Sequence, residues 1–189
     1  MNTPSHLIIN AALYKKAGRK DIPQSAILLG SIMPDIPLGL LTLGFYLYNR
    51  YIIGQVGSGF MPKAFDDLFF NNPWWIAFQN FLHSPTALLI YIVILWQFRH
   101  KTGTKGHWWL WFVAGCLVHT TLDIFTHVTD GPLLFWPFDW HIRFQSIISY
   151  YDRAYYGQYF SIFELALDVG LLGYLFLPRL WRKLKRSTG

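Results

Sequence analysis

Residues 115–127 read Gly-Cys-Leu-Val-His-Thr-Thr-Leu-Asp-Ile-Phe-Thr-His, an apolar run in which a histidine, an aspartate and a second histidine recur every four residues. Four residues make about 400° of α-helix, so His119 and Asp123 lie one turn apart on one face, with His127 only slightly displaced. Donors at this spacing can be directed at one metal ion. A buried histidine hydrogen-bonded to an aspartate fits equally well, and this stretch alone leaves both interpretations open.

The composition indicates a membrane-bound chain. Of the 189 residues, 53% are hydrophobic, 19% aromatic and 14% charged, whereas an ordinary soluble domain carries about 25% charged residues. No stretch reaches about 18 uninterrupted apolar residues, so we expect the spans to be short, tilted or partly covered by protein. We therefore predict an all-α fold, a single membrane-embedded helical bundle over residues 1–189 with aromatic covering loops.

Basic residues cluster in three short segments. Of the sixteen lysines and arginines, four lie in 15–20, three in 99–105 and five in 179–186. Each segment borders an apolar run, as the positive-inside pattern requires, and none interleaves basic and aromatic residues as a single-strand nucleic-acid binder does. We expect a multi-pass protein of the inner membrane, with no direct binding of nucleic acid. The segments expected in the cytoplasm are 15–21, 99–106 and 179–186.

Helix signals divide the chain into six apolar segments. Thr3 and Ser84 can each cap a helix that has proline at its first position. The two prolines of 34–37 place Asp35 on a stiff corner, and Pro178 is expected to end the last helix. The expected helices cover 3–14, 23–33, 38–51, 84–98, 107–127 and 160–177, with loops at 54–62, 99–106 and 131–140, an aromatic cover at 65–81 and a tyrosine-rich interfacial segment at 150–159.

Several polar residues gather at one depth when distances are counted from the ends of the basic segments. At 1.5 Å per residue, each lies about 14–24 Å along its helix from such an end. If the basic segments share one membrane face, these side chains form one layer towards the other face. An aspartate such as Asp123 at membrane depth costs about 2.5–3.5 kcal/mol, so it needs a compensating partner. The residues of this layer are His6, Asp35, His83, His119 and Glu164.

A divalent cation shared with imidazoles is the strongest such partner. Three histidines and two aspartates provide donors for one or two ions, with zinc as the first expectation, and pairs of ions hydrolyse phosphoesters by activating water. We expect Asp35 or Glu164 to accept the proton from water. Asp168 is expected to orient a histidine or to be structural, and the roles of His127 and His141 stay open. The predicted metal ligands are His6, Asp35, His83, His119 and Asp123.

The order of these motifs resembles a known family. In chain order the motifs are Thr3-Pro4-Ser5-His6, Pro34-Asp35, His83-Ser84, His119-x-x-x-Asp123 and Leu133-Leu134-Phe135-Trp136-Pro137-Phe138. Over roughly residues 3–140, the chain resembles the bacterial inner-membrane family of predicted metal-dependent hydrolases described as LexA-binding. That family is distantly similar to zinc-dependent phospholipase C, which is all-helical. The resemblance implies hydrolase activity and metal ligation by the same five residues.

Three functions follow from these patterns. The first is a membrane-embedded hydrolase of an ester or phosphoester in a lipid-like substrate, with segments 65–81 and 133–140 covering the site. The second is a non-enzymatic membrane scaffold or regulator with a structural His/Asp cluster, whose basic tail binds anionic lipid or a cytosolic partner. The third, a haem-binding electron carrier, is disfavoured by the two aspartates. Segment 37–82 leaves the number of membrane crossings open.

Overall fold

The computed structural model describes the backbone of residues 1–54 and 60–187, and the side chains of these residues except 60–61, 99–105, 179–180, 182–184 and 186–187. Within these residues the fold is all-α, as predicted, with one isolated antiparallel bridge between Leu133 and Arg143. The helices are α1 (Thr3–Ala17), α2 (Gln24–Gly30), α3 (Asp35–Tyr48), α4 (Phe60–Asn71), α5 (Pro73–Asn80), α6 (Pro85–Ile124) and α7 (Gly157–Ser187), with a π-helical turn η1 (Asn49–Ile53) and a 3₁₀ turn η2 (Arg153–Tyr155).

Most of the expected helix starts lie within three residues of the observed ones, but no helix begins at the expected position 107. Ser84 is the N-cap of α6, as predicted, but the N-cap of α1 is Asn2, so the prediction that Thr3 caps this helix was wrong. Thr3 lies in the first turn, where its hydroxyl donates to Asp35 instead. The aromatic cover expected at 65–81 is largely helical, and most of its residues belong to α4 or α5.

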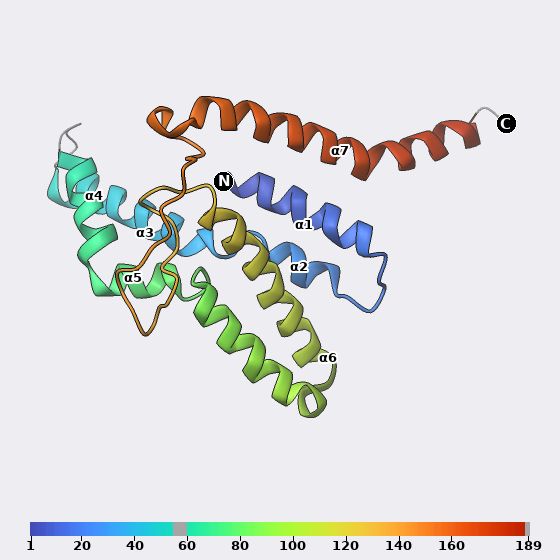
Figure 1. The fold of residues 1–189 in the computed structure, drawn as a ribbon, viewed down its shortest axis with the longest axis horizontal. Coiled ribbons are helices and arrows are strands. Elements are labelled where there is room, and N and C mark those ends of the chain that lie inside the picture. The colour runs from blue at the N-terminus through green and yellow to red at the C-terminus, as the bar shows by residue number, and fades with distance from the viewer. Residues whose placement is uncertain (55–59, 188–189) are drawn as a thin grey trace.

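Residues 99–106 were expected to form a basic loop, but they belong to helix α6. Its helical backbone runs from Pro85 to Ile124 and doubles back in the middle, so its two halves lie side by side (Figure 1). Leu88 of the first half packs with Phe112 and Cys116 of the second, and with Ala26 of α2, in the apolar core. The expected loop was therefore wrong. The segment contains no proline, so its backbone N–H groups remain available for helical hydrogen bonds.

Helix α7 continues through Pro178 to Ser187, so the prediction that this proline ends it was also wrong. Proline has no N–H for the carbonyl of Tyr174 one turn earlier, and its ring crowds that carbonyl. Lys15 of α1 replaces the missing donor. Its Nζ donates to the carbonyl oxygens of Tyr174 and Leu175, at 3.2 Å for Leu175, and lies 4.3 Å from the centroid of the Tyr174 ring. The contact also ties α7 to α1.

Helices α1 and α7 lie side by side and run in the same direction (Figure 1). Asn2 and Ser5 contact Glu164 and Asp168 near the beginning of both helices, whereas Lys15 contacts α7 far along it. Nε2 of His107 lies 2.7 Å from the Asp21 carbonyl oxygen, so the segment after the reversal of α6 reaches the α1–α2 connection. The polar and basic ends of the molecule are thus separated, and the cytoplasmic position of the basic end stays a prediction.

Helices α2 and α6 touch at two glycines. A Cβ on Gly30 would overlap the Phe112 carbonyl oxygen, and a Cβ on Gly115 would lie 2.7 Å from the Ile27 carbonyl oxygen. Neither glycine has a positive φ, so the close approach itself excludes a larger residue. The crossing brings the carbonyl of Ser31, just after α2, against α6.

Among the residues that the structure describes, one helix, Gly157–Pro178, is long and apolar enough to cross a membrane. Only 6% of its apolar window is buried, which leaves its sides free to contact lipid. Two bent pairs also qualify if each is counted as one span: Gln24–Gly30 with Asp35–Ile53, bent by 46°, and Pro73–Asn80 with Pro85–Phe98, bent by 51°. Over the described residues the fold therefore offers one to three spans, and the multi-pass arrangement stays a prediction.

Gly115→Ala should destabilise the protein by about 1–3 kcal/mol, the usual cost of overpacking, because the added methyl group must push α2 away from α6. Thermal unfolding of the detergent-purified protein, followed by circular dichroism, measures this as a lower Tm. Gly170→Ala is the matched control, since a Cβ there meets nothing within 4 Å. An unchanged Tm for Gly115→Ala would contradict the close crossing.

Lys15→Met should also lower the Tm, because it leaves the carbonyls of Tyr174 and Leu175 without their donor. In a Pro178→Ala background residue 178 regains its N–H, so the same substitution should cost less. The difference between the two costs, measured as a double-mutant cycle, reports the coupling between Lys15 and Pro178. Equal costs in both backgrounds would show that the lysine does not compensate for the proline.

Candidate metal centre

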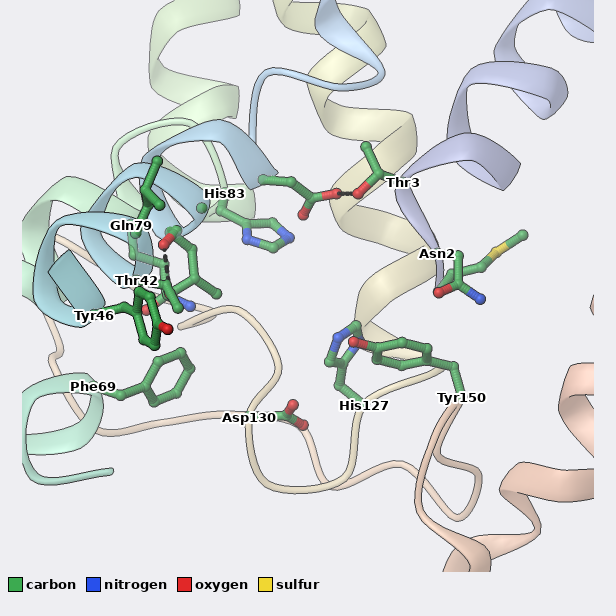
Figure 2. Close-up of a pocket in the computed structure, with 15 residues that line it drawn as sticks. Asn2, Thr3, Thr42, Tyr46, Phe69, Gln79, His83, His127, Asp130 and Tyr150 are labelled. Atoms are coloured by element: carbon green, nitrogen blue, oxygen red, sulfur yellow. Dashed lines mark hydrogen bonds between the residues drawn. The ribbon is translucent and has the colours of Figure 1, made fainter. Parts of the chain in front are cut away.

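The five predicted ligands converge, and one of them, His83, is seen in Figure 2 at a cavity of about 640 Å³. His6 comes from α1, Asp35 is the first residue of α3, His83 lies in the turn before α6, and His119 and Asp123 occupy the last turns of α6. All but Asp35 are buried. Separate elements thus supply a common set of imidazole and carboxylate groups, and Asp35 and His83 line the cavity directly.

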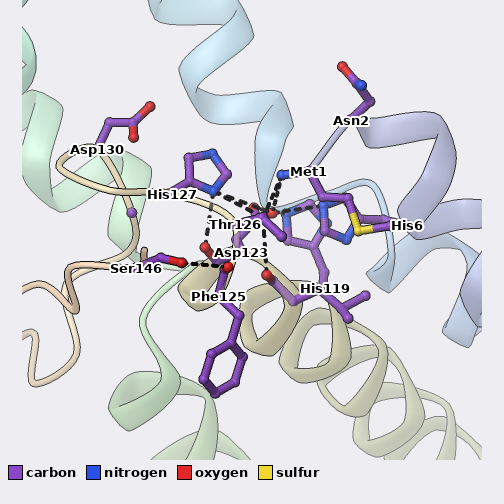
Figure 3. Close-up of polar contacts among 12 residues, drawn as sticks. Met1, Asn2, His6, His119, Asp123, Phe125, Thr126, His127, Asp130 and Ser146 are labelled. Carbon is purple, nitrogen blue, oxygen red and sulfur yellow. Dashed lines mark hydrogen bonds and ion pairs between the residues drawn. The ribbon is translucent and has the colours of Figure 1, made fainter. Parts of the chain in front are cut away.

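Asp123 lies at the centre of this cluster (Figure 3). Its Oδ2 is 3.0 Å from Nε2 of both His83 and His119, and its Oδ1 is 2.9 Å from Nε2 of His6. The Met1 amino nitrogen is 3.0 Å from the same Oδ1. Because the side chain is only 2% exposed, its charge must be balanced by these neighbours or by a cation among them.

Asp35 adds a second carboxylate to the cluster. Its Oδ1 lies 3.3 Å from Nε2 of His119, and its Oδ2 accepts the hydroxyl of Thr3. The candidate ligand atoms of Asp35, His83, His119 and Asp123 all lie within 4.8 Å of one another, so this group could hold a metal ion. His6 approaches the opposite oxygen of Asp123, so both oxygens of this carboxylate lie close to imidazoles.

The protonation of His119 tests whether these residues fit a metal. Its Nδ1 lies 2.7 Å from the Ser31 carbonyl oxygen, which can only accept, so Nδ1 carries a proton. In the neutral ring, Nε2 then has a lone pair facing two carboxylates. This Nε2 and both ring nitrogens of His6 have no hydrogen-bond partner of good geometry, although carboxylate oxygens are near. A cation between the imidazoles and carboxylates would satisfy Nε2 of His119 and Nε2 of His6, so the residues fit a metal.

The helix crossing described above sets this tautomer. His119 and Asp123 share a face through their i, i+4 spacing, as predicted, but the Ser31 carbonyl reaches His119 only because Gly30 and Gly115 let α2 approach α6. The rings of His6 and His119 stack with centroids 3.7 Å apart. Two imidazolium ions at that distance would repel each other, so at most one of these rings is charged.

His127, whose role the sequence left open, lies at the edge of the cavity. Its Nδ1 is 3.0 Å from the backbone carbonyl oxygen of Asp123, so Nδ1 is protonated and Nε2 is the free acceptor. The ring lies 4.8 Å from that of Tyr150, centroid to centroid (Figure 2). Burial raises the pKa of Tyr150 to about 12, so its phenol is a hydrogen-bond donor at neutral pH.

Glu164 lies apart from the ligand atoms. Its two oxygens accept from the backbone N–H of Asn2 at 2.8 Å and from the Asn2 side chain at 2.7 Å, and it does not line the cavity. Asp168 accepts the hydroxyl of Ser5 at 2.7 Å. Both carboxylates therefore hold α1 against α7. His141 is exposed on the irregular segment that follows α6, and the side chain of His100 lies outside the described residues.

The sequence did not single out several residues of the site. Thr3 was expected only as a cap, and Gln79, Asp130 and Tyr150 were assigned no role, although all four line the cavity. The irregular segment 125–156 brings Asp130 and Tyr150 there through backbone hydrogen bonds such as Tyr150 N–H to Thr126 O at 3.0 Å. No periodic pattern accompanies such a segment, so no sequence signal could have placed these residues.

Glu164→Ala should lower the Tm by removing two hydrogen bonds to a charged group, at about 1.5–3 kcal/mol each, but should leave the metal content unchanged. Asp123→Ala should remove the bound metal, because it takes away the carboxylate that every imidazole approaches. Elemental analysis of both detergent-purified variants measures the difference. An equal loss of metal in Glu164→Ala would place Glu164 in the metal centre.

Comparisons with known proteins agree with the membrane character of the chain. A search of curated proteins and a search of solved structures each found no match. Residues 1–184 match a family model whose description is YdjM inner membrane protein. That description names a location and no activity. Because the match covers almost the whole chain, the chain belongs to the YdjM family of inner membrane proteins.

Proposed function

We propose that this chain is a membrane-embedded metal-dependent hydrolase that acts on an ester or phosphoester of a lipid-like substrate. The observation that carries the proposal is the buried Nε2 of His119, which lies 3.3 Å from Asp35 and 3.0 Å from Asp123, close to the cavity, without a hydrogen bond of good geometry. A core hydrogen bond from this atom would need a second proton on the ring, and the imidazolium so formed would stack on the His6 ring with centroids 3.7 Å apart.

The donor set is suited to a divalent ion. Imidazole nitrogens and carboxylate oxygens are the ligands of catalytic zinc, and such sites also take manganese or iron. When bound, the metal would supply a Lewis acid and make water acidic near neutral pH. We expect His83, His119, Asp35 and Oδ2 of Asp123 to hold one ion, and His6 with Oδ1 of Asp123 to contribute to a second.

Asp35 is the best placed residue to accept a proton from water. It is only partly buried and lines the cavity, whereas Asp123 is enclosed by imidazoles. Thr3 donates to Oδ2 of Asp35, which fixes the carboxylate and leaves Oδ1 facing His119. Glu164 is already bound to Asn2, so its position favours Asp35 for this role.

Metal analysis of the detergent-purified protein tests the proposal. We expect stoichiometric zinc, manganese or iron in the wild type, its loss in the His119→Ala, Asp123→Ala double variant, and its retention in the control His141→Ala. Chelation should lower the Tm, because a ligand that binds only the folded state stabilises it. Hydrolysis of a panel of phosphodiesters and phospholipids should then be lost with the metal and restored by adding it back.

Two results would count against the hydrolase. If the wild type carries no stoichiometric metal, or if the double variant keeps it, the cluster is structural and the membrane scaffold or regulator is the better description. If metal is present but no ester or phosphoester is cleaved, the metal centre stands and the reaction does not.

A further inference from the structure

A second groove lies along α1, where this helix runs between α2 and α7 (Figure 1). Helix α1 packs against both neighbours, and residues of all three helices line the groove. Its volume is about 370 Å³, and no described residue lines both this groove and the cavity of the metal centre. Helix α1 contributes Leu7, Ile8, Ala11, Tyr14 and Lys15.

The groove is apolar at one end and cationic at the other. The residues that α1 contributes recur at helical spacing, so they form one face and follow one another along the groove. The distance from Leu7 to Lys15 is about 12 Å along the helix axis. Lys15 is the one charged residue among the described lining residues, whereas leucine and isoleucine line the other end.

Lys15 also lies at the depth where the candidate membrane span ends. Its ammonium group donates to the carbonyl oxygens of Tyr174 and Leu175, and the span ends at Pro178, about one turn further along α7. Carbonyl oxygens are neutral, and among the described residues no carboxylate forms an ion pair with Lys15. The positive charge of this lysine is therefore available to an anion at the membrane surface.

The sides of the groove are open to the surroundings of the molecule. Leu7 of α1 is 36% exposed, and Leu172 and Phe176 of α7 are 39% and 51% exposed. Both α7 residues lie inside the candidate span. In a protein of the inner membrane the hydrocarbon chains of lipids reach such a surface, and the phosphate groups lie at the end of the span, which is the depth of Lys15.

We propose that this groove binds one anionic phospholipid of the membrane, with an acyl chain along Leu7, Ile8 and Ala11 and the phosphate group at Lys15. A basic residue at a membrane surface favours a lipid of net negative charge by about 5-fold. The bound lipid fills the space between α2 and α7. Because the groove is separate from the metal centre, the inference does not rest on the proposed hydrolase.

Native mass spectrometry of the full-length protein in detergent tests the proposal by counting bound lipids. The probes are palmitoyl-oleoyl phosphatidylglycerol, which has a net negative charge, and palmitoyl-oleoyl phosphatidylcholine, which has the same chains and phosphate without net charge. Glycerophosphoglycerol is the head group without chains. We expect one phosphatidylglycerol per chain, bound about 5-fold more tightly than phosphatidylcholine, and no binding of the chainless probe at the same concentration.

Two variants test the two ends of the groove separately. Lys15→Met keeps the apolar stem and removes the charge, so it should weaken phosphatidylglycerol binding about 5-fold, to the level of phosphatidylcholine. Ala11→Leu fills the floor of the groove and should cause the loss of both lipids, while the contacts of Lys15 with α7 remain. Ala166→Leu, at an exposed alanine of α7 outside the groove, is the matched control and should retain both lipids.

Several results would overturn the proposal. Equal binding of the two lipids, or an unchanged preference in Lys15→Met, would exclude selection by charge. Unchanged lipid binding in Ala11→Leu would place the lipid elsewhere on the protein, and equal binding of the chainless probe would exclude the acyl chain from the groove. A dimer of the wild type that Ala11→Leu dissociates would show that a second copy of the chain, and not a lipid, occupies this face.

Discussion

The structure depends on the buried carboxylate of Asp123. A carboxylate that is almost fully enclosed is stable only if its charge is balanced at short range, and here three imidazoles approach it from three elements of the chain. The same requirement draws α1, the turn before α6 and the end of α6 to one point. Stability and function are therefore coupled in this cluster, since the groups that balance the charge are also those that can hold a metal.

Two packing features hold the helices that supply the cluster. The glycine contact between α2 and α6 lets the Ser31 carbonyl fix the proton of His119, and so decides which nitrogen faces the carboxylates. At the other end of α1, Lys15 binds the Tyr174 carbonyl, which Pro178 leaves without a donor, and the neighbouring Leu175 carbonyl, and so holds α7 against α1. Neither feature belongs to the site, yet each controls the position of residues within it.

The cavity beside the cluster is lined by both polar and apolar side chains. Asp35 and His83 of the cluster line it together with Gln79, Asp130 and apolar residues of α3, a helix of a bent pair that could cross the membrane. The irregular segment 125–156 completes the enclosure, which explains why a non-helical stretch with many exposed aromatic residues follows the last ligand.

The sequence by itself determined the helical class, the membrane character and the candidate ligands. The i, i+4 spacing of His119 and Asp123 is a local property of a helix, and counting along helices from the basic segments needs only their rise per residue, so His6, Asp35 and His83 could be assigned to the same layer. Glu164 was assigned to that layer by the same count, but distance along an axis does not say which way a side chain faces, and it contacts Asn2 instead. Only the tertiary structure decided the passage of α7 through Pro178, the tautomer of His119 and the presence of Gln79 and Asp130 in the cavity. The physical reason is that each of these depends on a contact between segments far apart in the chain, which no local periodicity records.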